Sequence, residues 1–105
     1  MNVISRKKLR EFCESDPAHG RHWSAFETWF KIARKASWAN FSDAKSTFGQ
    51  TDIAKGDTGR TATIFDVGGN KYRILAHVDY RRQTIKIEAV LDHKEYDKNL
   101  WKKLF

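Results

Sequence analysis

Hydrophobic residues near the start of the chain recur at intervals of three and four, which is the spacing of one face of an α-helix. The residues on this face are Leu9, Phe12 and Cys13. The pattern predicts a helix over residues 6–15, preceded by a short strand at residues 3–4. A serine directly before a helix commonly caps its first turn through the side-chain oxygen, so we expect Ser5 to be the N-cap.

A second helical pattern follows at once. Asp16 and Pro17 mark its start, because aspartate is a good N-cap and proline fits the first turn of a helix. The apolar residues that keep the helical spacing are Trp23, Phe26, Trp29 or Phe30, and Ala33. This pattern predicts one helix over residues 16–36, and we expect its aromatic side chains in the core rather than around a ligand.

Beyond an irregular stretch at residues 37–59, the hydrophobic period changes to two, as in a β-strand. The alternation predicts three strands, at residues 61–67, 72–80 and 85–91. Gly68, Gly69 and Asn70 separate the first two strands and accept the positive φ angles of a tight hairpin turn. The run from residue 96 to residue 105 predicts a short closing helix.

These elements predict an α+β fold in which two N-terminal helices pack on a small, mainly antiparallel sheet. With 105 residues the chain suits one domain over residues 1–105, and its 13% aromatic content excludes an intrinsically disordered chain. No apolar run approaches the roughly 18 residues of a membrane span, and no signal-peptide pattern is present. The single cysteine cannot form an internal disulfide. We therefore expect a cytoplasmic protein with no membrane association.

The chain is strongly basic, with 20 Lys and Arg against 13 Asp and Glu and a net charge of +7. The first 35 residues carry 8 basic and 4 acidic residues, and the last 35 carry 9 and 5, so the excess lies at the two ends. A positive surface attracts polyanions, because binding releases counterions and the field steers association. The charge therefore favours nucleic acid or an acidic protein as the partner.

The motifs of several enzyme classes are missing from this chain. It contains no phosphate-binding loop, no H-E-x-x-H zinc motif and no G-x-S-x-G nucleophile turn. Its four His and one Cys show no metal-ligand spacing. We therefore expect neither a metal site nor a cofactor.

Basic and aromatic residues gather where two predicted strands meet. Lys71 and Arg73 follow the hairpin turn, and His93 and Tyr96 follow the third predicted strand. The end of a third strand in a meander lies antiparallel to the start of the second, so these side chains can converge on one patch. An imidazole, fixed cations and a phenol suit RNA cleavage, in which a 2′-hydroxyl is deprotonated and a crowded phosphate is stabilised. The same residues also fit an ordinary solvated turn.

Two segments of the chain resemble a known family. Residues 65–74, FDVGGNKYRI, are similar to the F-x-V-G-G-N-K-Y-R-L hairpin of the HigB toxins, in the RelE superfamily of bacterial toxin–antitoxin systems. Residues 93–98, HKEYDK, resemble the T-H-x-E-Y-D-K segment near the end of these toxins, and Trp101 stands where the family often has an aromatic residue. Residues 3–9 and 38–52 also fit, so the resemblance covers essentially the whole chain.

The resemblance implies a compact RelE-like fold and a metal-independent, ribosome-dependent mRNA endoribonuclease that inhibits translation. It also implies two partners, mRNA on the ribosome and a HigA-type helix-turn-helix antitoxin. In this interpretation Lys71 and Arg73 hold phosphate, His93 transfers a proton, and Tyr96 stacks on the RNA or donates a hydrogen bond to it. Asp92 stands where the family commonly has threonine, and we expect its carboxylate either to orient His93 or to repel the phosphate.

Five further basic residues are candidate RNA contacts. They are Lys94 and Lys98 beside the predicted site, and Arg6, Lys7 and Arg10 on the first predicted helix. The alternative function is a non-catalytic module of the same fold that binds RNA or a protein through this basic surface. Substitution of Lys71 or His93 would lower the affinity of a binder, whereas an enzyme would lose turnover first.

Overall fold

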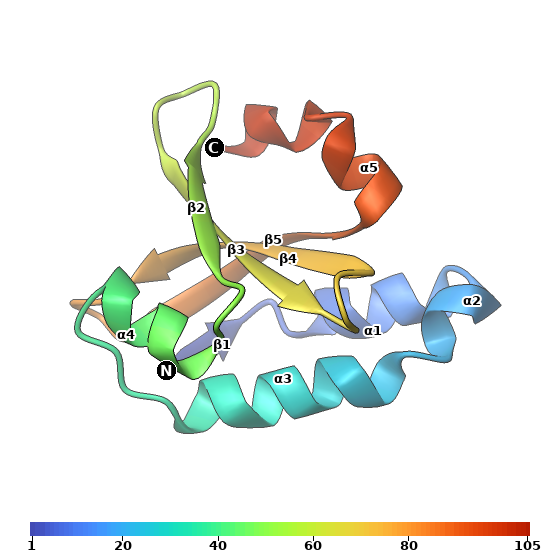
Figure 1. The fold of residues 1–105 in the computed structure, drawn as a ribbon, viewed down its shortest axis with the longest axis horizontal. Helices are drawn as coiled ribbons and strands as arrows, with labels where there is room; N and C mark the ends of the chain where they lie inside the picture. Colours follow the sequence, from blue (N-terminus) through green and yellow to red (C-terminus); the bar gives the residue numbers. More distant parts are fainter.

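The computed structural model describes residues 1–105 and contains one mixed β-sheet with helices on both faces (Figure 1). The strands are β1 (Asn2–Ile4), β2 (Asp52–Lys55), β3 (Thr61–Val67), β4 (Tyr72–Asp79) and β5 (Thr84–Asp92). The helices are α1 (Lys7–Glu14), α2 (Pro17–Gly20), α3 (Trp23–Lys35), α4 (Phe41–Thr47), α5 (His93–Asp97) and the 3₁₀-helix η1 (Leu100–Leu104). The strand order is β1-β5-β4-β3-β2, in which only β1 and β5 are parallel. The predicted α+β class with a mainly antiparallel sheet is confirmed.

The sheet is buried on both faces, and each face has its own hydrophobic core. In Figure 1, α1 and α3 lie on one side of the sheet, and α5 and η1 lie on the other. Side chains of β3 alternate between the two: Phe65 and Val67 join the larger core, and Ala62 and Ile64 join the smaller one. Strands β3 and β4 therefore present one face to the N-terminal helices and the other to the C-terminal segment.

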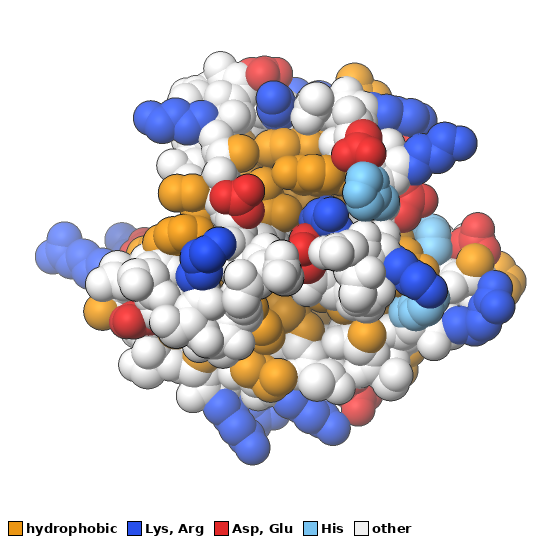
Figure 2. Space-filling model, viewed as in Figure 1, with side chains coloured by type: hydrophobic (Ala, Val, Ile, Leu, Met, Phe, Trp, Pro, Cys, Tyr) orange, Lys and Arg blue, Asp and Glu red, His pale blue; other side chains and the backbone are white.

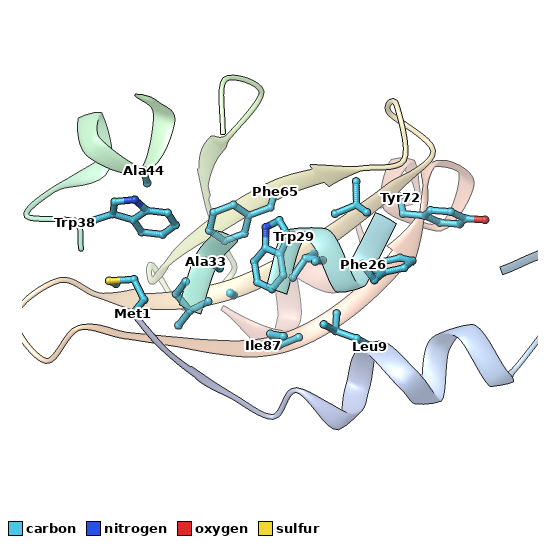
Figure 3. Close-up of a cluster of buried hydrophobic side chains, with 14 of the residues drawn as sticks. Met1, Leu9, Phe26, Trp29, Ala33, Trp38, Ala44, Phe65, Tyr72 and Ile87 are labelled. Atoms are coloured by element: carbon cyan, nitrogen blue, oxygen red, sulfur yellow. The ribbon is translucent and has the colours of Figure 1, made fainter. Parts of the chain in front are cut away.

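Phe65 is the centre of the larger core, which is aromatic (Figure 3). It is fully buried, and its ring lies 5.2 Å from the ring of Trp29, 6.0 Å from Trp38 and 5.7 Å from Phe48. Trp29 and Phe26 come from one face of α3, as their helical spacing requires. The predicted core role of the aromatic residues is confirmed, and each such buried ring contributes about 1.5–3 kcal/mol of hydrophobic stabilisation.

The helical region differs from its prediction in two ways. The predicted helix over residues 16–36 is two helices, α2 and α3, with a break after Gly20, a residue of low helix propensity that approaches the carbonyl of Cys13. Asp16 caps α2 as predicted and accepts from Ala18 N at 2.8 Å. Ser5 is not a side-chain cap: its φ is 67°, and it is the Ser5 carbonyl that accepts from Lys8 N at 3.0 Å.

The middle of the chain, expected to be irregular, contains both α4 and β2. Asn40 caps α4 through its side chain, which accepts from Asp43 N at 3.1 Å. Strand β2 pairs with β3, with Asp52 opposite Ile64. Both elements are short and mostly exposed, with Ala44 the only buried residue of α4. Their weak hydrophobic periodicity hides them in the sequence, so the sheet has β2 in addition to the three predicted meander strands and the predicted N-terminal strand.

The turn between β3 and β4 has the predicted left-handed backbone. Gly68, Gly69 and Asn70 have φ angles of 70°, 62° and 71°. Glycine adopts this conformation without steric cost, and asparagine tolerates it better than most residues. The turn sets the register of the hairpin, in which Asp66 is opposite Arg73.

The C-terminal segment crosses the second face of the sheet as two short helices, α5 and η1, in place of one helix over residues 96–105. The helical conformation is interrupted at Asn99, whose φ is 61°. Trp101 and Phe105 are buried against the sheet, and Phe105 lies so close to Gly56 that a Cβ there would collide with it. Phe105 O also accepts from Arg60 N at 2.9 Å. These contacts fix the segment that carries His93 and Tyr96.

Candidate active site

The pairing of β4 with β5 brings the two predicted halves of the site together. Tyr72 is opposite Asp92 and Arg73 is opposite Leu91 in this antiparallel pair. The ladder continues past the strand end, where His93 N donates to Lys71 O at 3.0 Å. Lys71 and His93 therefore leave the sheet at the same corner, as the antiparallel arrangement predicts. From here on, the corner means this end of the β4–β5 pair with the side chains of Lys71, Arg73, His93 and Tyr96 and the acidic residues that contact them.

Arg73 lies at the centre of this corner and is held from several directions. Its Nε forms an ion pair with Asp66 Oδ1 at 2.9 Å, and its Nη1 donates to the carbonyl oxygens of Asn70 at 3.0 Å and Tyr72 at 3.3 Å. The guanidinium also lies 5.4 Å from the centre of the Tyr96 ring. Only 12% of the Arg73 side chain is exposed, so this cation is ordered before any ligand arrives.

Asp66 is the acidic partner of Arg73, and its side chain is only 16% exposed. Burial raises the pKa of the Asp66 carboxyl, an effect that the positive charges of Arg73 and His93 oppose. The carboxylate and the guanidinium thus stabilise each other in a place that water reaches poorly.

His93 is the first residue of α5, and its partner is Asp97 rather than Asp92. Its Nδ1 lies 2.8 Å from Asp97 Oδ2, one helical turn away, whereas Asp92 accepts from Glu95 N at 2.8 Å and so caps the helix. The expectation that Asp92 orients the imidazole is therefore wrong. A carboxylate only accepts, so this contact favours a proton on Nδ1, and in a neutral ring Nε2 is then the proton acceptor.

Tyr96 forms the aromatic side of the corner. Its ring stacks on buried Trp101 with 5.5 Å between centroids and 5° between planes, and Trp101 Nε1 donates to Tyr96 O at 3.2 Å. Burial raises the pKa of the Tyr96 hydroxyl, which therefore stays protonated at neutral pH and can donate a hydrogen bond. Figure 2 shows the result on the surface, where basic, acidic and histidine side chains lie side by side next to exposed hydrophobic atoms.

Comparison with known proteins identifies the family. A family model described as HigB_toxin, the RelE-like toxic component of a toxin–antitoxin system, matches residues 22–99, which include the whole corner. The chain belongs to the HigB family. As a member of a toxin–antitoxin family, it has an antitoxin as its partner.

Individual HigB relatives match over almost the full length. The mRNA interferase toxin HigB of Escherichia coli strain K12 is 30% identical over 97 residues, covering 92% of this chain and 88% of the relative. The mRNA interferase HigB of Shigella flexneri gives the same values. An mRNA interferase HigB of Escherichia coli O6:H1 is 21% identical over 98 residues, covering 93% of this chain and 90% of the relative.

The five further basic candidates of this HigB-family chain do not all gather at the corner. Lys94 is exposed on α5, and Lys98 binds Glu95 at 2.8 Å, a hydrogen bond that raises the pKa of the lysine. The three on the N-terminal side are Arg6, Lys7 and Arg10. Arg6 directly precedes α1 and lies 4.2 Å above the ring of Phe30, and the other two lie on α1, which packs on the opposite face of the sheet.

Two residues of the HigB corner were missed in the sequence. Asp66 could have been found from the turn, because four residues between Val67 and Tyr72 place Asp66 opposite Arg73. Asp97 follows His93 by four positions, the spacing at which side chains on a helix meet. This spacing brings the two side chains together only within a helix. The sequence predicted a helix only from residue 96, which is after His93.

The structure shows neither a cluster of metal ligands nor a helix that could span a membrane. No three His, Cys, Asp or Glu side chains gather closely enough to hold a metal ion. No helix combines the length and the apolar character that crossing a membrane requires.

Proposed function

We propose that this protein is a cytoplasmic mRNA interferase that cleaves mRNA on the ribosome and thereby inhibits translation. Membership of the HigB family supports the proposal, as do the names of relatives that match over about nine-tenths of their length. The net charge of +7 supports it too, because RNA is a polyanion. The observation that carries it is the ordered Arg73, which lies against the ring of Tyr96 at the corner where the backbone of His93 pairs with that of Lys71.

Arg73 would bind the phosphate at the cleaved bond. Its Nε and Nη1 are occupied within the protein, whereas its Nη2 makes no hydrogen bond there and is free for a phosphate oxygen. A cation already fixed in place stabilises the extra negative charge of the transition state without having to reorganise. The exposed side chains of Lys71 and Lys94 add positive charge around it.

His93 would move the proton. In the proposed step Nε2 accepts the proton of a 2′-hydroxyl, the 2′-oxygen bonds to phosphorus, and the bond from phosphorus to the 5′-oxygen breaks. The 5′-oxygen leaves as a hydroxyl after taking up a proton, which we propose the Tyr96 phenol supplies. The products are a 2′,3′-cyclic phosphate and a 5′-hydroxyl, and the step uses only side chains of this chain.

The test uses translating ribosomes with a defined mRNA and maps the chemistry of the fragment ends. We expect a 2′,3′-cyclic phosphate and a 5′-hydroxyl, whereas fragments with a 3′-hydroxyl and a 5′-phosphate would indicate attack by water and refute the mechanism. His93→Ala separates an enzyme from a binding module, because an enzyme loses turnover while a module loses affinity. Expression of the chain alone is expected to arrest growth, and normal growth with folded protein in the cells would oppose a toxin.

We also propose that the antitoxin is a HigA-type helix-turn-helix protein that presents acidic side chains to the basic surface. Complementary charge speeds association, and buried apolar anchors supply most of the affinity. Arg6, Lys7 and Arg10 lie away from the corner, and we assign them to RNA outside the cleaved segment. Co-purification with the neighbouring helix-turn-helix protein at moderate salt tests the partner, and failure to co-purify would contradict it.

A further inference from the structure

A polar pocket of about 390 Å³ lies beside the corner, between the hairpin turn and the connection from α4 to β2. Its walls include the side chains of Thr47 and Gln50 on one side and of Asn70 on the other, with Phe48 as the single apolar wall. Asp66 also lines this pocket, and no step of the proposed mechanism uses the space.

Asp66 connects the pocket to Arg73. Its Oδ1 forms an ion pair with Arg73 Nε at 2.9 Å, while its Oδ2 makes no hydrogen bond within the protein. With only 16% of its side chain exposed, this carboxylate has one acceptor atom without a protein donor. Because Asp66 lines the pocket, this acceptor is open to a ligand that brings an N–H group.

We propose that this pocket binds a nucleobase next to the cleaved bond and that Asp66 selects bases with an amino group over uracil. The inference rests on the proposed function, because it assigns the pocket to the RNA whose phosphate Arg73 holds. Adenine, cytosine and guanine each carry an exocyclic amine that can donate to a carboxylate, whereas the one donor on the pairing edge of uracil, N3–H, lies between two carbonyl oxygens that would face its negative charge. The amides of Asn70 and Gln50 both donate and accept, so they suit the remaining edge of any of the three bases.

The first experiment measures base preference directly. Translating ribosomes receive an mRNA library randomised around one codon, and cleavage is mapped for the wild type, Asp66→Asn and Asp57→Asn. Asp57 is exposed in the β2–β3 connection, so its variant makes the same charge change outside the pocket. The wild type and Asp57→Asn are expected to disfavour uracil by about tenfold at one position within two nucleotides of the cut.

In Asp66→Asn, the ratio of cleavage with the other bases to cleavage with uracil at this position is expected to fall close to one, because an amide can donate to the carbonyl oxygens of uracil. Asp66 also holds Arg73, so the variant is expected to slow cleavage of all sequences, and the readout is the ratio between bases. A wild type without discrimination against uracil, or an Asp66→Asn variant that keeps it, would overturn the proposal while leaving the interferase intact.

A second variant and a binding measurement cover the remaining outcomes. Asn70→Gly removes one wall, and glycine accepts the φ of 71° at this position, so the fold is kept and the base ratio is expected to change. If Asp66→Asn does not fold, an unchanged ratio in Asn70→Gly overturns the proposal. If the wild type cleaves nothing, the proposed function fails. NMR titration with AMP, CMP, GMP and UMP then tests whether the pocket binds a base and whether it excludes uracil. Shifts at the amides of Gln50 and Asn70 with the first three only would support it, and equal or absent shifts would overturn it.

Discussion

Asp66 and Arg73 face each other across β3 and β4, and Arg73 Nε forms an ion pair with Asp66 Oδ1 over 2.9 Å. Each side chain is mostly removed from water, so each needs the other to satisfy its charge. The pair also fixes which part of the guanidinium remains for a ligand, since Nη1 is occupied by backbone carbonyls. Loss of either partner therefore affects both the fold and the corner.

Arg73→Ala is expected to slow mRNA cleavage by about 30- to 1000-fold, which is about 2–4 kcal/mol of transition-state stabilisation. It should also lower the free energy of unfolding by about 1–3 kcal/mol, because the Asp66 carboxylate is left without its donor. Single-turnover cleavage and urea unfolding measure the two effects. Arg82→Ala is the control, because this exposed arginine has the same charge and lies outside the corner. Wild-type cleavage by Arg73→Ala would remove Arg73 from the mechanism.

Asp97→Asn is expected to reduce the turnover of cleavage by about tenfold to hundredfold, with little change in KM. The amide can no longer act as a pure acceptor, so it does not hold Nδ1 as the donor and Nε2 as the proton acceptor. Glu95→Gln makes the same charge change on the same helix, away from the imidazole, and should retain wild-type turnover. Equal activity of the two variants would show that Asp97 does not position His93.

His93→Ala is expected to cost about 2–4 kcal/mol of transition-state stabilisation if the imidazole is the base. The cleavage rate on ribosomes measures this loss, with folding verified by thermal unfolding. A much smaller loss, together with the full effect in Arg73→Ala, would assign most of the catalysis to the fixed cation.

Phe65→Ala is expected to lower the free energy of unfolding by about 3–5 kcal/mol. The ring is fully buried among Trp29, Trp38 and Phe48, so its removal leaves a cavity that the surrounding rings cannot fill. Leu100→Ala is the control, because that side chain is 64% exposed and its loss should change stability by no more than about 0.5 kcal/mol. Urea unfolding measures both variants, and equal effects would contradict the assigned core.

His77 is expected to make the protein less stable in mild acid. Burial against the Phe105 ring lowers the pKa of His77, although Glu88 opposes the shift and Arg60 and Lys86 add to it. The unfolded chain then binds a proton more readily than the folded one, so stability is complete above about pH 6.5 and declines as the pH falls towards the folded pKa.

Replacing this side chain tests the assignment. In His77→Gln the difference in free energy of unfolding between about pH 7.5 and 5.5 is expected to be smaller than in the wild type. Urea unfolding at the two pH values measures it. The same difference in both proteins would mean that another group causes the acid sensitivity.

The sequence by itself determined the hairpin and, with it, half of the corner. Alternation predicted β3 and β4, and the Gly68–Asn70 turn set their register, so the apposition of Asp66 and Arg73 was already encoded locally. The antiparallel return of β5 likewise placed His93 beside Lys71. Such features can be predicted because they depend on neighbouring residues and on a period that hydrophobic burial imposes.

The tertiary structure alone decided the rest, because the energies involved come from residues far apart in the chain. Strand β2 has too few apolar side chains to reveal itself and exists because β3 offers it an edge to pair with. The choice of Asp97 over Asp92 as the partner of His93 follows from where α5 begins, which depends on how Trp101 and Phe105 anchor the C-terminal segment on the sheet. The placement of Arg6, Lys7 and Arg10 away from the corner follows in the same way from the burial of Leu9 against the opposite face.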